Sequence, residues 1–291
     1  MNDFQYSAPH DLAEATELLA EYGDRAQILA GGTDIIVQLR EGHRDADMVI
    51  DIKQIPELTE MEFSADNGLR LGASVSCFRI YEDPAVSRAY PALADSTNII
   101  GGWQIQSRAS VGGNLCNSSP AADTIPSLIA HGVTCRIAGP EGERTVTAEN
   151  FCTAPGRNVL ADGELLVDLR FPPPQPRASS AYQRFIPRNE MDIAVAGAGS
   201  YLELEDDGET IKAARIALAA VAATPQFAAA ASESLVGKPA NDESFAAAGE
   251  LAKEVASPIT DMRGTVEYRI HLSSVLTRRT LATALARIKE N

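Results

Sequence analysis

Hydrophobic positions over the first 60 residues follow strand and helix periods in turn. Every second residue over 4–8 is apolar, which predicts a strand, and apolar residues at helical spacing over 11–20 predict a helix. Short apolar runs over 27–30 and 48–52 predict two more strands, with a short helix over 35–40 between them. We therefore expect a strand–helix–strand–helix–strand unit.

Between residues 61 and 171 the pattern changes to antiparallel strands and helices. Two segments over 61–65 and 69–73 flank the turn Asp66-Asn67-Gly68, which predicts a hairpin. Residues 101–120 are rich in glycine and asparagine, and we expect a loop over 110–123. The other expected elements are a helix over 84–96, a helix over 124–131 with Asp123 or Thr124 as its N-cap, and strands over 133–138 and 164–171.

A proline-rich stretch, Pro172 to Pro176, divides the chain, because consecutive prolines cannot continue a sheet and form a stiff extended link. Strand patterns follow over 181–185, 193–204 and 211–222. Alanine-rich stretches then predict helices over 227–236, 245–256 and 264–289.

Two domains are therefore expected. The first covers 1–176 and has two lobes, over about 1–58 and 59–176. The second covers 177–291 and is a small α+β domain, in which helices lie on one side of a three-stranded antiparallel sheet. The chain length of 291 residues agrees with two domains, since a domain averages about 150 residues.

The charge balance limits the partners that the chain can have. The chain has 25 basic and 40 acidic side chains, a formal net charge of −15. Nucleic acid and an anionic membrane surface both repel such a chain, so neither is expected as its main partner. No apolar run approaches the roughly 20 residues of a membrane span, and the start has no secretion signal. We therefore expect a soluble, cytoplasmic protein.

The cysteines and histidines do not predict a metal site. The four cysteines, Cys77, Cys116, Cys135 and Cys152, are dispersed and form no Cys-x-x-Cys pair. The four histidines are dispersed as well. Zinc and iron–sulfur sites need clustered ligands, so we expect reduced thiols and no metal bound by this chain.

Two glycine-containing segments are candidates for ligand binding. The first, Ala30-Gly31-Gly32-Thr33-Asp34, lies between a predicted strand and a predicted helix. Glycines let the backbone turn sharply and approach a ligand closely, and free N–H groups at the start of a helix attract anions. Alone, this segment is compatible both with an ordinary turn and with a phosphate-binding loop.

The second segment runs from Ser110 to Asp123 and combines paired glycines with hydroxyl, amide and acidic side chains. Its Asp123 is equally suited to accept hydrogen bonds from a ligand and to cap the following helix. Two such segments in one domain favour a dinucleotide, because each can hold one half of a pyrophosphate. Neither has the Gly-x-Gly-x-x-Gly pattern, so a standard Rossmann site is excluded.

Side chains for catalysis without a cofactor are not apparent. Asp51 and Asp168 end or interrupt predicted strands, and we expect them to be hydrogen-bonded structural residues rather than general bases. A bound cofactor explains this lack, because it supplies its own chemistry and leaves binding and orientation to the protein.

These segments resemble the FAD-binding medium subunit of the molybdenum hydroxylases, the family of xanthine dehydrogenase and aerobic carbon monoxide dehydrogenase. The resemblance extends over nearly the whole chain and implies a two-lobed FAD-binding domain of the vanillyl-alcohol-oxidase (PCMH) type, followed by a smaller α+β domain. The matching stretches are Leu29-Ala30-Gly31-Gly32-Thr33-Asp34, Val111-Gly112-Gly113-Asn114, Ser119-Pro120-Ala121-Ala122-Asp123, Glu164-Leu165-Leu166, Met191-Asp192-Ile193-Ala194, Tyr268-Arg269 and His271-Leu272.

The resemblance also implies which residues bind FAD. Residues 31–34 would hold its diphosphate, the second segment would form the opposite wall, and Asp123 would lie on the ribityl or adenosine side. One of Leu165 and Leu166 would lie near a ring, and Arg184, where relatives often have lysine, near the flavin. The complete predicted set is Leu29, Ala30, Gly31, Gly32, Thr33, Asp34, Ile35, Ser110, Gly113, Asn114, Cys116, Ser119, Asp123, Leu165, Leu166 and Arg184.

Two residues near the second segment depart from the family pattern. Gln106 lies where many relatives have arginine, and Trp103 is unusual at its position. Trp103 is compatible with packing under the second segment and with shielding the flavin.

The resemblance further implies a heteromeric oxidoreductase. The molybdenum cofactor would lie on a large partner subunit and the iron–sulfur clusters on a small one, most simply as a dimer of heterotrimers. Electrons would pass through the clusters to FAD on this chain and then to a quinone, oxygen or NAD. The chain has no four-cysteine insertion of the benzoyl-CoA-reductase type, which favours an ordinary hydroxylase or dehydrogenase. A self-sufficient FAD oxidoreductase and a cofactor-free binding protein are the alternatives.

Overall fold

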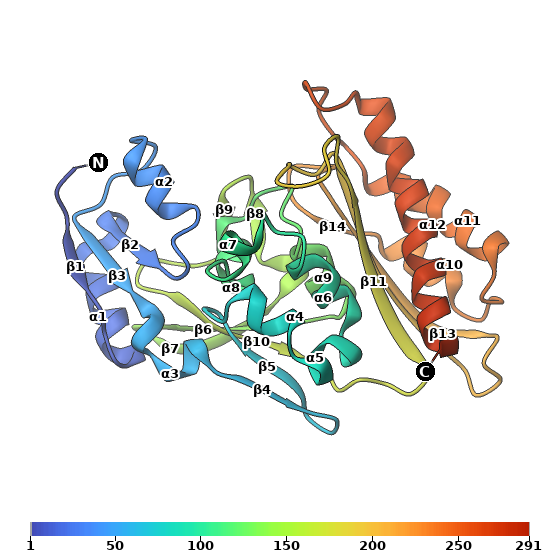
Figure 1. The fold of residues 1–291 in the computed structure, drawn as a ribbon, viewed down its shortest axis with the longest axis horizontal. Helices are drawn as coiled ribbons and strands as arrows, with labels where there is room; N and C mark the ends of the chain where they lie inside the picture. Colours follow the sequence, from blue (N-terminus) through green and yellow to red (C-terminus); the bar gives the residue numbers. More distant parts are fainter. Residues whose placement is uncertain (1, 291) are drawn as a thin grey trace.

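The computed structural model describes residues 2–290, and residues 2–54 form a small lobe around a parallel sheet (Figure 1). The strands β1 (Gln5–Ser7), β2 (Ala26–Leu29) and β3 (Met48–Asp51) are arranged in the order β1-β3-β2. The helices α1 (Leu12–Tyr22) and α2 (Ile35–Arg40) connect them. The predicted strand–helix–strand–helix–strand unit is therefore confirmed.

The second lobe is built around a five-stranded antiparallel sheet. Its strand order is β4-β5-β10-β6-β7, and the predicted hairpin over 61–73 forms β4 and β5. The sequence did not indicate β7, because nearly all its side chains are exposed and no apolar alternation marks it. The strands are β4 (Met61–Ser64), β5 (Gly68–Gly72), β6 (Thr134–Gly139), β7 (Gly142–Thr147) and β10 (Leu165–Phe171), with a separate pair β8 (Cys152–Ala154) and β9 (Arg157–Asn158).

Short helices surround this sheet, and two expectations about them were wrong. The single helix expected over 84–96 is broken at Tyr90, because a residue before proline avoids the helical conformation and Pro91 begins a new helix. The loop expected over 110–123 contains the helix α8, and the sequence did not indicate the short helix α7 before it. The helices of this lobe are α3 (Pro56–Thr59), α4 (Cys77–Tyr81), α5 (Pro84–Ala89), α6 (Pro91–Thr97), α7 (Trp103–Gln106), α8 (Val111–Asn117) and α9 (Ile125–Ala130).

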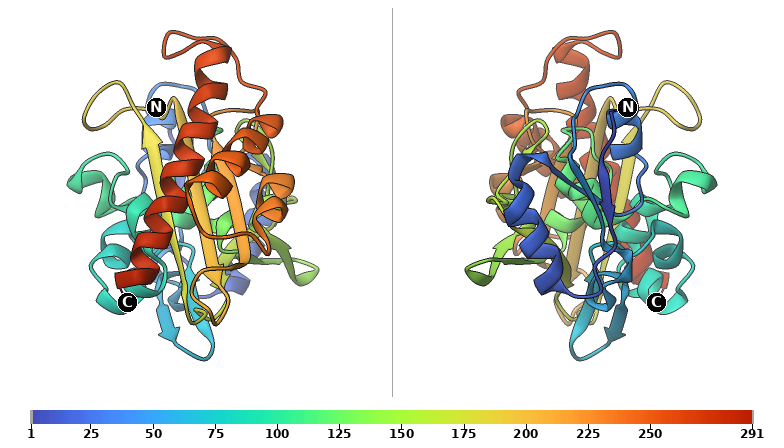
Figure 2. Two further views of the ribbon diagram at one scale, coloured as in Figure 1. Left: turned by 90° about the vertical axis from the view of Figure 1, so that its right-hand side faces the viewer. Right: turned by 90° about the vertical axis from the view of Figure 1, so that its left-hand side faces the viewer.

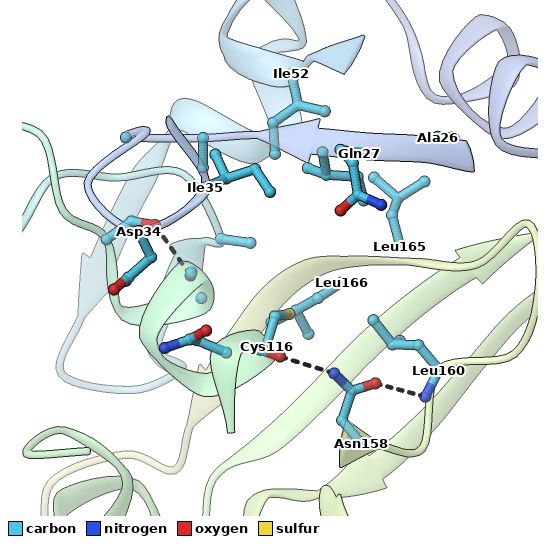
Figure 3. A pocket seen from close by; sticks show the side chains of 18 of the residues that line it. Ala26, Gln27, Asp34, Ile35, Ile52, Cys116, Asn158, Leu160, Leu165 and Leu166 are labelled. Carbon is cyan, nitrogen blue, oxygen red and sulfur yellow. Dashed lines mark hydrogen bonds between the residues drawn. The ribbon is translucent and has the colours of Figure 1, made fainter. Parts of the chain in front are cut away.

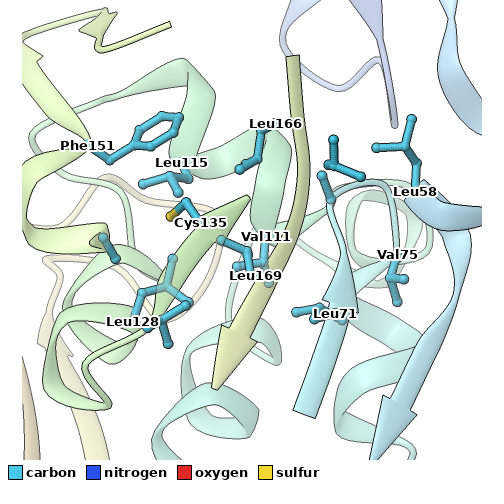
Figure 4. Packing of buried hydrophobic residues seen from close by; sticks show 14 of the residues in the cluster. Leu58, Leu71, Val75, Val111, Leu115, Leu128, Cys135, Phe151, Leu166 and Leu169 are labelled. Carbon is cyan, nitrogen blue, oxygen red and sulfur yellow. The ribbon is translucent and has the colours of Figure 1, made fainter. Parts of the chain in front are cut away.

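Packing explains why α8 is a helix in spite of its paired glycines. A Cβ atom on Gly112 would lie 2.4 Å from the carbonyl oxygen of Ala73, so only glycine lets α8 approach the backbone that follows β5. Val111 and Leu115 of α8 are buried in the core of this lobe, together with Leu71 and Leu169 of the sheet (Figure 4). This burial outweighs the low helix propensity of glycine.

The C-terminal part contains an antiparallel sheet covered by helices on one side. Strands β11 (Ala178–Phe185), β12 (Ala196–Leu204) and β13 (Ile211–Ala219) form the predicted sheet, and the two-residue β14 (Gln226–Phe227) extends it. Figure 2 shows the helices lying across its outer face. They are α10 (Ala229–Leu235), α11 (Asp242–Ala252) and α12 (Val266–Glu290).

The other face of this sheet packs on the second lobe. A Cβ atom on Gly199 of β12 would lie 2.8 Å from the carbonyl oxygen of Pro126 in α9. The small residues over 196–200 therefore let the sheet lie close to that helix. On this side the sheet buries Ser180 of β11, whose Oγ accepts a hydrogen bond from Ala92 N of α6 at 3.0 Å. Arg287 of α12 also forms an ion pair with Asp95 of α6 at 2.8 Å.

His131, at the end of α9, is buried where the two parts meet. Its ring lies 5.3 Å from that of Tyr90 and 5.8 Å from that of Tyr201, and its Nε2 is 3.0 Å from Ser180 Oγ. Burial, with a smaller effect of Arg215, lowers the pKa of His131 from 6.5 to about 3. The imidazole is therefore neutral in the folded chain at neutral pH.

We expect His131 to make stability depend on pH below 6.5. As the pH falls, the unfolded chain binds a proton at His131 before the folded chain does. The stabilising contribution of the neutral, buried imidazole is therefore complete above pH 6.5 and is lost as the pH falls towards 3. The expected slope is about 1.4 kcal/mol per pH unit for one site. His131→Gln cannot titrate, so urea unfolding between pH 7 and 4.5 should show a flatter curve for this variant than for wild type. Parallel curves would exclude this role.

Candidate functional site

One cavity of about 450 Å³ lies between the first and second lobes (Figure 3). Such a volume is within the range of small-molecule and cofactor sites. Its walls come from the segment after β2, the start of α2, the segment before α8 with α8 itself, and the chain over 158–166. Both glycine-containing segments singled out in the sequence face this one cavity.

The first segment leaves β2 and bends sharply before α2. Gly32 has φ +79°, a conformation that favours glycine. A Cβ atom on Gly31 would lie 1.9 Å from the carbonyl oxygen of Arg108, so the two walls are in backbone contact here. Asp34 occupies the N-cap position of α2, but its side chain accepts no capping hydrogen bond from that helix. Burial raises the pKa of its carboxyl. Asp34 is one of the residues that line the cavity.

The second wall is ordered by side-chain hydrogen bonds. Ser110 caps α8, and its Oγ accepts a hydrogen bond from Gly113 N at 3.1 Å. The Oδ1 atom of Asn114 accepts a hydrogen bond from Thr124 Oγ1 at 2.6 Å. Since the amide oxygen of Asn114 is engaged, its Nδ2 group is the part available to donate to a ligand.

The third wall is mainly apolar. Leu165 and Leu166 begin β10 and line the cavity with Cys116 of α8. Asn158 joins these elements, because its side chain donates to Cys116 O at 2.9 Å and accepts from Leu160 N at 3.0 Å (Figure 3). Burial, with a smaller contribution from Cys152, raises the pKa of the Cys116 thiol to about 12, so the thiol stays protonated at neutral pH.

Acidic side chains outnumber basic ones around the cavity. Arg44 is the single basic side chain among the described lining residues, and Glu164 is already paired with Arg144 at 2.6 Å. A negatively charged group in this cavity must therefore be held mainly by backbone N–H groups and polar side chains, the donors that glycine-containing segments expose. The acidic lining residues are Asp24, Asp34, Asp162 and Glu164.

Most of the predicted site residues meet at this cavity. Four of the predicted set do not line it, namely Leu29, Ser119, Asp123 and Arg184. Those that line it are Ala30, Gly31, Gly32, Thr33, Asp34, Ile35, Ser110, Gly113, Asn114, Cys116, Leu165 and Leu166.

The residues outside the cavity have other contacts. Asp123 accepts a hydrogen bond from Tyr182 Oη at 2.7 Å and forms a buried ion pair with Arg184. Asp123 therefore joins the second lobe to β11 and does not cap α9. Thr124 holds the N-cap position of α9, but its side chain makes no capping hydrogen bond either. Arg184 also donates to the carbonyl oxygen of Ile99 at 2.9 Å. The next residue, Ile100, lines the cavity.

Leu29 and Ser119 are also accounted for by local contacts. Leu29 packs on a small apolar cluster with Leu39 and Val49. Ser119 Oγ accepts a hydrogen bond from Ala121 N at 3.3 Å in the turn after α8.

The two unusual residues near α8 are separate from the cavity lining. Trp103 is 81% exposed, so it does not pack under the second segment. Gln106 is buried, accepts from Tyr81 Oη at 2.8 Å and donates to Asn98 O at 2.9 Å. It has a structural role at this position.

Asp51 and Asp168 are hydrogen-bonded structural residues, as expected. Asp51 binds Lys53 and Tyr6, and the fully buried Asp168 binds Arg136 at 2.7 Å and Arg170 at 3.1 Å.

Several lining residues could not be found from the sequence. Gln27, Gln38, Arg44, Ile100 and Asn158 are single residues without a motif, and only the tertiary structure brings them to the cavity. Within residues 2–290, histidine, cysteine, aspartate and glutamate side chains form no group of three that could hold a metal ion. No helix in the same range is long and apolar enough to cross a membrane.

Comparisons with known proteins agree with this architecture. The family described as the FAD binding domain in molybdopterin dehydrogenase matches residues 2–174, and the CO dehydrogenase flavoprotein C-terminal domain matches 171–284. The putative xanthine dehydrogenase FAD-binding subunit of Escherichia coli K12 is 32% identical over 288 residues, 98% of each chain. The carbon monoxide dehydrogenase medium chain of Hydrogenophaga pseudoflava is 29% identical over 284 residues, also 98% of each.

Solved structures agree as well. A chain of reconstituted CO dehydrogenase from Oligotropha carboxidovorans superimposes with a TM-score of 0.93 at 28% identity, covering 98% of this chain and 99% of that one. A chain of quinoline 2-oxidoreductase from Pseudomonas putida 86 gives 0.89 at 30% identity, with 98% of each covered. The fold and the matched families define a flavoprotein of the molybdenum hydroxylases. The chain belongs to the family of their FAD-binding medium subunits, which confirms the resemblance and the predicted fold class.

Proposed function

We propose that this chain binds FAD in the cavity between its two lobes and transfers electrons within a molybdenum-containing hydroxylase or dehydrogenase. The observation that carries the proposal is the meeting of both glycine-containing segments at one cavity. FAD supplies the redox chemistry. The backbone of residues 31–33 would hold the diphosphate from one side, and Ser110, Gly113 and Asn114 would face it from the other.

The two leucines and the ion pair of Asp123 and Arg184 have separate roles in this proposal. Leu165 and Leu166 offer an apolar surface to a ring of the cofactor. Asp123 and Arg184 would act next to the cavity by holding the segment that contains Ile99 and Ile100. Since the acidic lining cannot attract a diphosphate, the backbone donors would provide most of its binding free energy.

The same proposal includes an assembly of this chain with two partner subunits. Electrons would arrive from iron–sulfur clusters on a small partner subunit, which receive them from a molybdenum cofactor on a large one. They would leave FAD for an acceptor outside the complex. We propose a dimer of heterotrimers in the cytoplasm, and a domain boundary at residues 176–177 of this chain. A self-sufficient FAD oxidoreductase is not favoured, because the relatives named above are subunits and chains of larger enzymes.

A visible absorbance spectrum of the purified chain, with identification of the released cofactor, tests this proposal. We expect flavin bands that yield FAD, and their loss in Gly32→Trp, because this position has φ +79° and lies at the cavity. Gly208→Trp is the matched control, since Gly208 has φ +70° with no atom within 4 Å and lies in a distant hairpin. A colourless, folded wild-type chain that takes up no added FAD would contradict the proposal.

A further inference from the structure

Lys53 is tied to the start of the first glycine-containing segment. It follows β3 in a short 3-10 helix (Ile52–Gln54), and its Nζ donates to the carbonyl oxygen of Ala30 at 2.9 Å. The same Nζ forms an ion pair with Asp51 Oδ1 at 2.6 Å. Ala30 lines the cavity and directly precedes Gly31, whereas Lys53 lies outside the lining. The ammonium group of Lys53 therefore binds the first glycine-containing segment from outside the cavity lining.

The partner of Lys53 is itself held in place. Asp51 ends β3, and its Oδ2 accepts a hydrogen bond from Tyr6 Oη at 2.8 Å. Its Oδ1 also accepts one from Lys53 N at 3.1 Å. Asp51 lies opposite Leu29 in the register of β3 and β2, and Tyr6 belongs to β1. Residues from all three strands of the parallel sheet are thus joined at the point where the glycine-containing segment begins.

We propose that Lys53 is a positioning residue, which presets the Ala30–Gly31 peptide so that residues 31–33 are ordered before FAD arrives. The inference rests on the proposed FAD site. A peptide group is planar and trans, so a carbonyl held by Lys53 turns the N–H of Gly31 to the opposite side, away from Lys53. Two consecutive glycines have unusual backbone freedom, and ordering them in advance removes an entropic cost from binding.

The ion pair between Lys53 and Asp51 would not by itself preset the Ala30–Gly31 peptide. Pairs between partly exposed groups contribute little to stability, and the side chain of Lys53 is 31% exposed. What distinguishes Lys53 is its hydrogen bond to a backbone carbonyl of the binding segment. We therefore expect its loss to weaken FAD binding while the unfolding of the FAD-free chain changes little.

Titration of the FAD-free full chain with FAD, followed by flavin fluorescence and visible circular dichroism, tests the inference. We expect Lys53→Met to raise the Kd for FAD about ten-fold, and Lys53→Arg, which keeps N–H donors, to recover most of the affinity. Lys253→Met is the matched control, because Lys253 has an ion pair of the same 2.6 Å length and is 29% exposed, on a distant helix end. It should leave the Kd unchanged.

The outcomes separate the inference from the proposed function. A wild-type chain that binds no FAD would overturn both. Wild-type binding with an unchanged Kd in Lys53→Met would overturn the role of Lys53 alone. If Lys53→Met does not fold, Asp51→Asn decides, because it keeps the shape of the carboxylate and removes the charge that holds the ammonium. We expect it to raise the Kd about three-fold with an unchanged circular dichroism spectrum of the FAD-free chain, and an unchanged Kd would count against the role.

Discussion

Gly31→Ala is expected to weaken FAD binding by about 10- to 100-fold. The added Cβ atom would lie 1.9 Å from the carbonyl oxygen and 2.5 Å from the carbonyl carbon of Arg108. These are backbone atoms of the opposite wall and cannot rotate away, so the two lobes must move apart. Forcing one carbon into a packed site costs roughly 1–3 kcal/mol, and the displaced walls would no longer face the diphosphate together. Isothermal titration of the FAD-free chain measures this change.

A matched glycine shows whether the contact between the walls is responsible. Gly102→Ala adds the same atom to extended backbone, where the nearest neighbour is the flexible side chain of Gln104 at 3.2 Å. We expect its FAD affinity to remain near that of wild type. If Gly31→Ala binds FAD as tightly as Gly102→Ala, close backbone contact between the two walls is not required for binding.

Asp123→Ala is expected to be the most destabilising of the substitutions considered. The carboxylate pairs with Arg184 and accepts the Tyr182 hydroxyl, and both Asp123 and Arg184 are largely shielded from water. Removing one partner of a buried ion pair leaves an uncompensated charge and typically costs 3–5 kcal/mol. The free energy of unfolding, measured in urea with and without FAD, should fall by about this amount.

The origin of this loss can be tested with a double substitution. Asp123→Leu combined with Arg184→Met removes both charges, and we expect it to recover most of the stability because no unpaired charge remains. Asp47→Ala is the exposed counterpart, since the side chains of Asp47 and of its partner Arg25 are both more than half exposed, and it should cost less than about 1 kcal/mol. A double variant as unstable as Asp123→Ala would show that packing, rather than the unpaired charge, causes the loss.

Elements with a strong local pattern were predictable from the sequence. The alternating and helical periods over 4–52 gave the parallel lobe correctly, and Asp66-Asn67-Gly68 marked the hairpin of β4 and β5. Prediction failed where local preference conflicts with context. Pro91 divides α5 from α6, and α8 forms across Gly112 and Gly113 because burial of its apolar residues outweighs their propensity.

The candidate site was predictable where it consists of continuous segments. Residues 30–35 and 110–116 contain the glycines and polar groups that suit an anionic ligand, and these lie at the cavity. The isolated lining residues Gln27, Arg44 and Asn158 have no signal in the sequence. The resemblance assigned Asp123 and Arg184 to FAD binding. In the structure they pair with each other and do not line the cavity, although Ile100 nearby does.

The order of elements, the two glycine-containing segments and the family could therefore be predicted from the sequence, because these depend on local periodicity, backbone freedom and continuous motifs. What those segments face, and which residues hold them, depends on tertiary packing. Gly31 meets Arg108 across 77 residues of chain, and Lys53 reaches Ala30 only because β2 and β3 are neighbours in a parallel sheet. Contacts of this kind follow from strand order and packing, which no local pattern encodes.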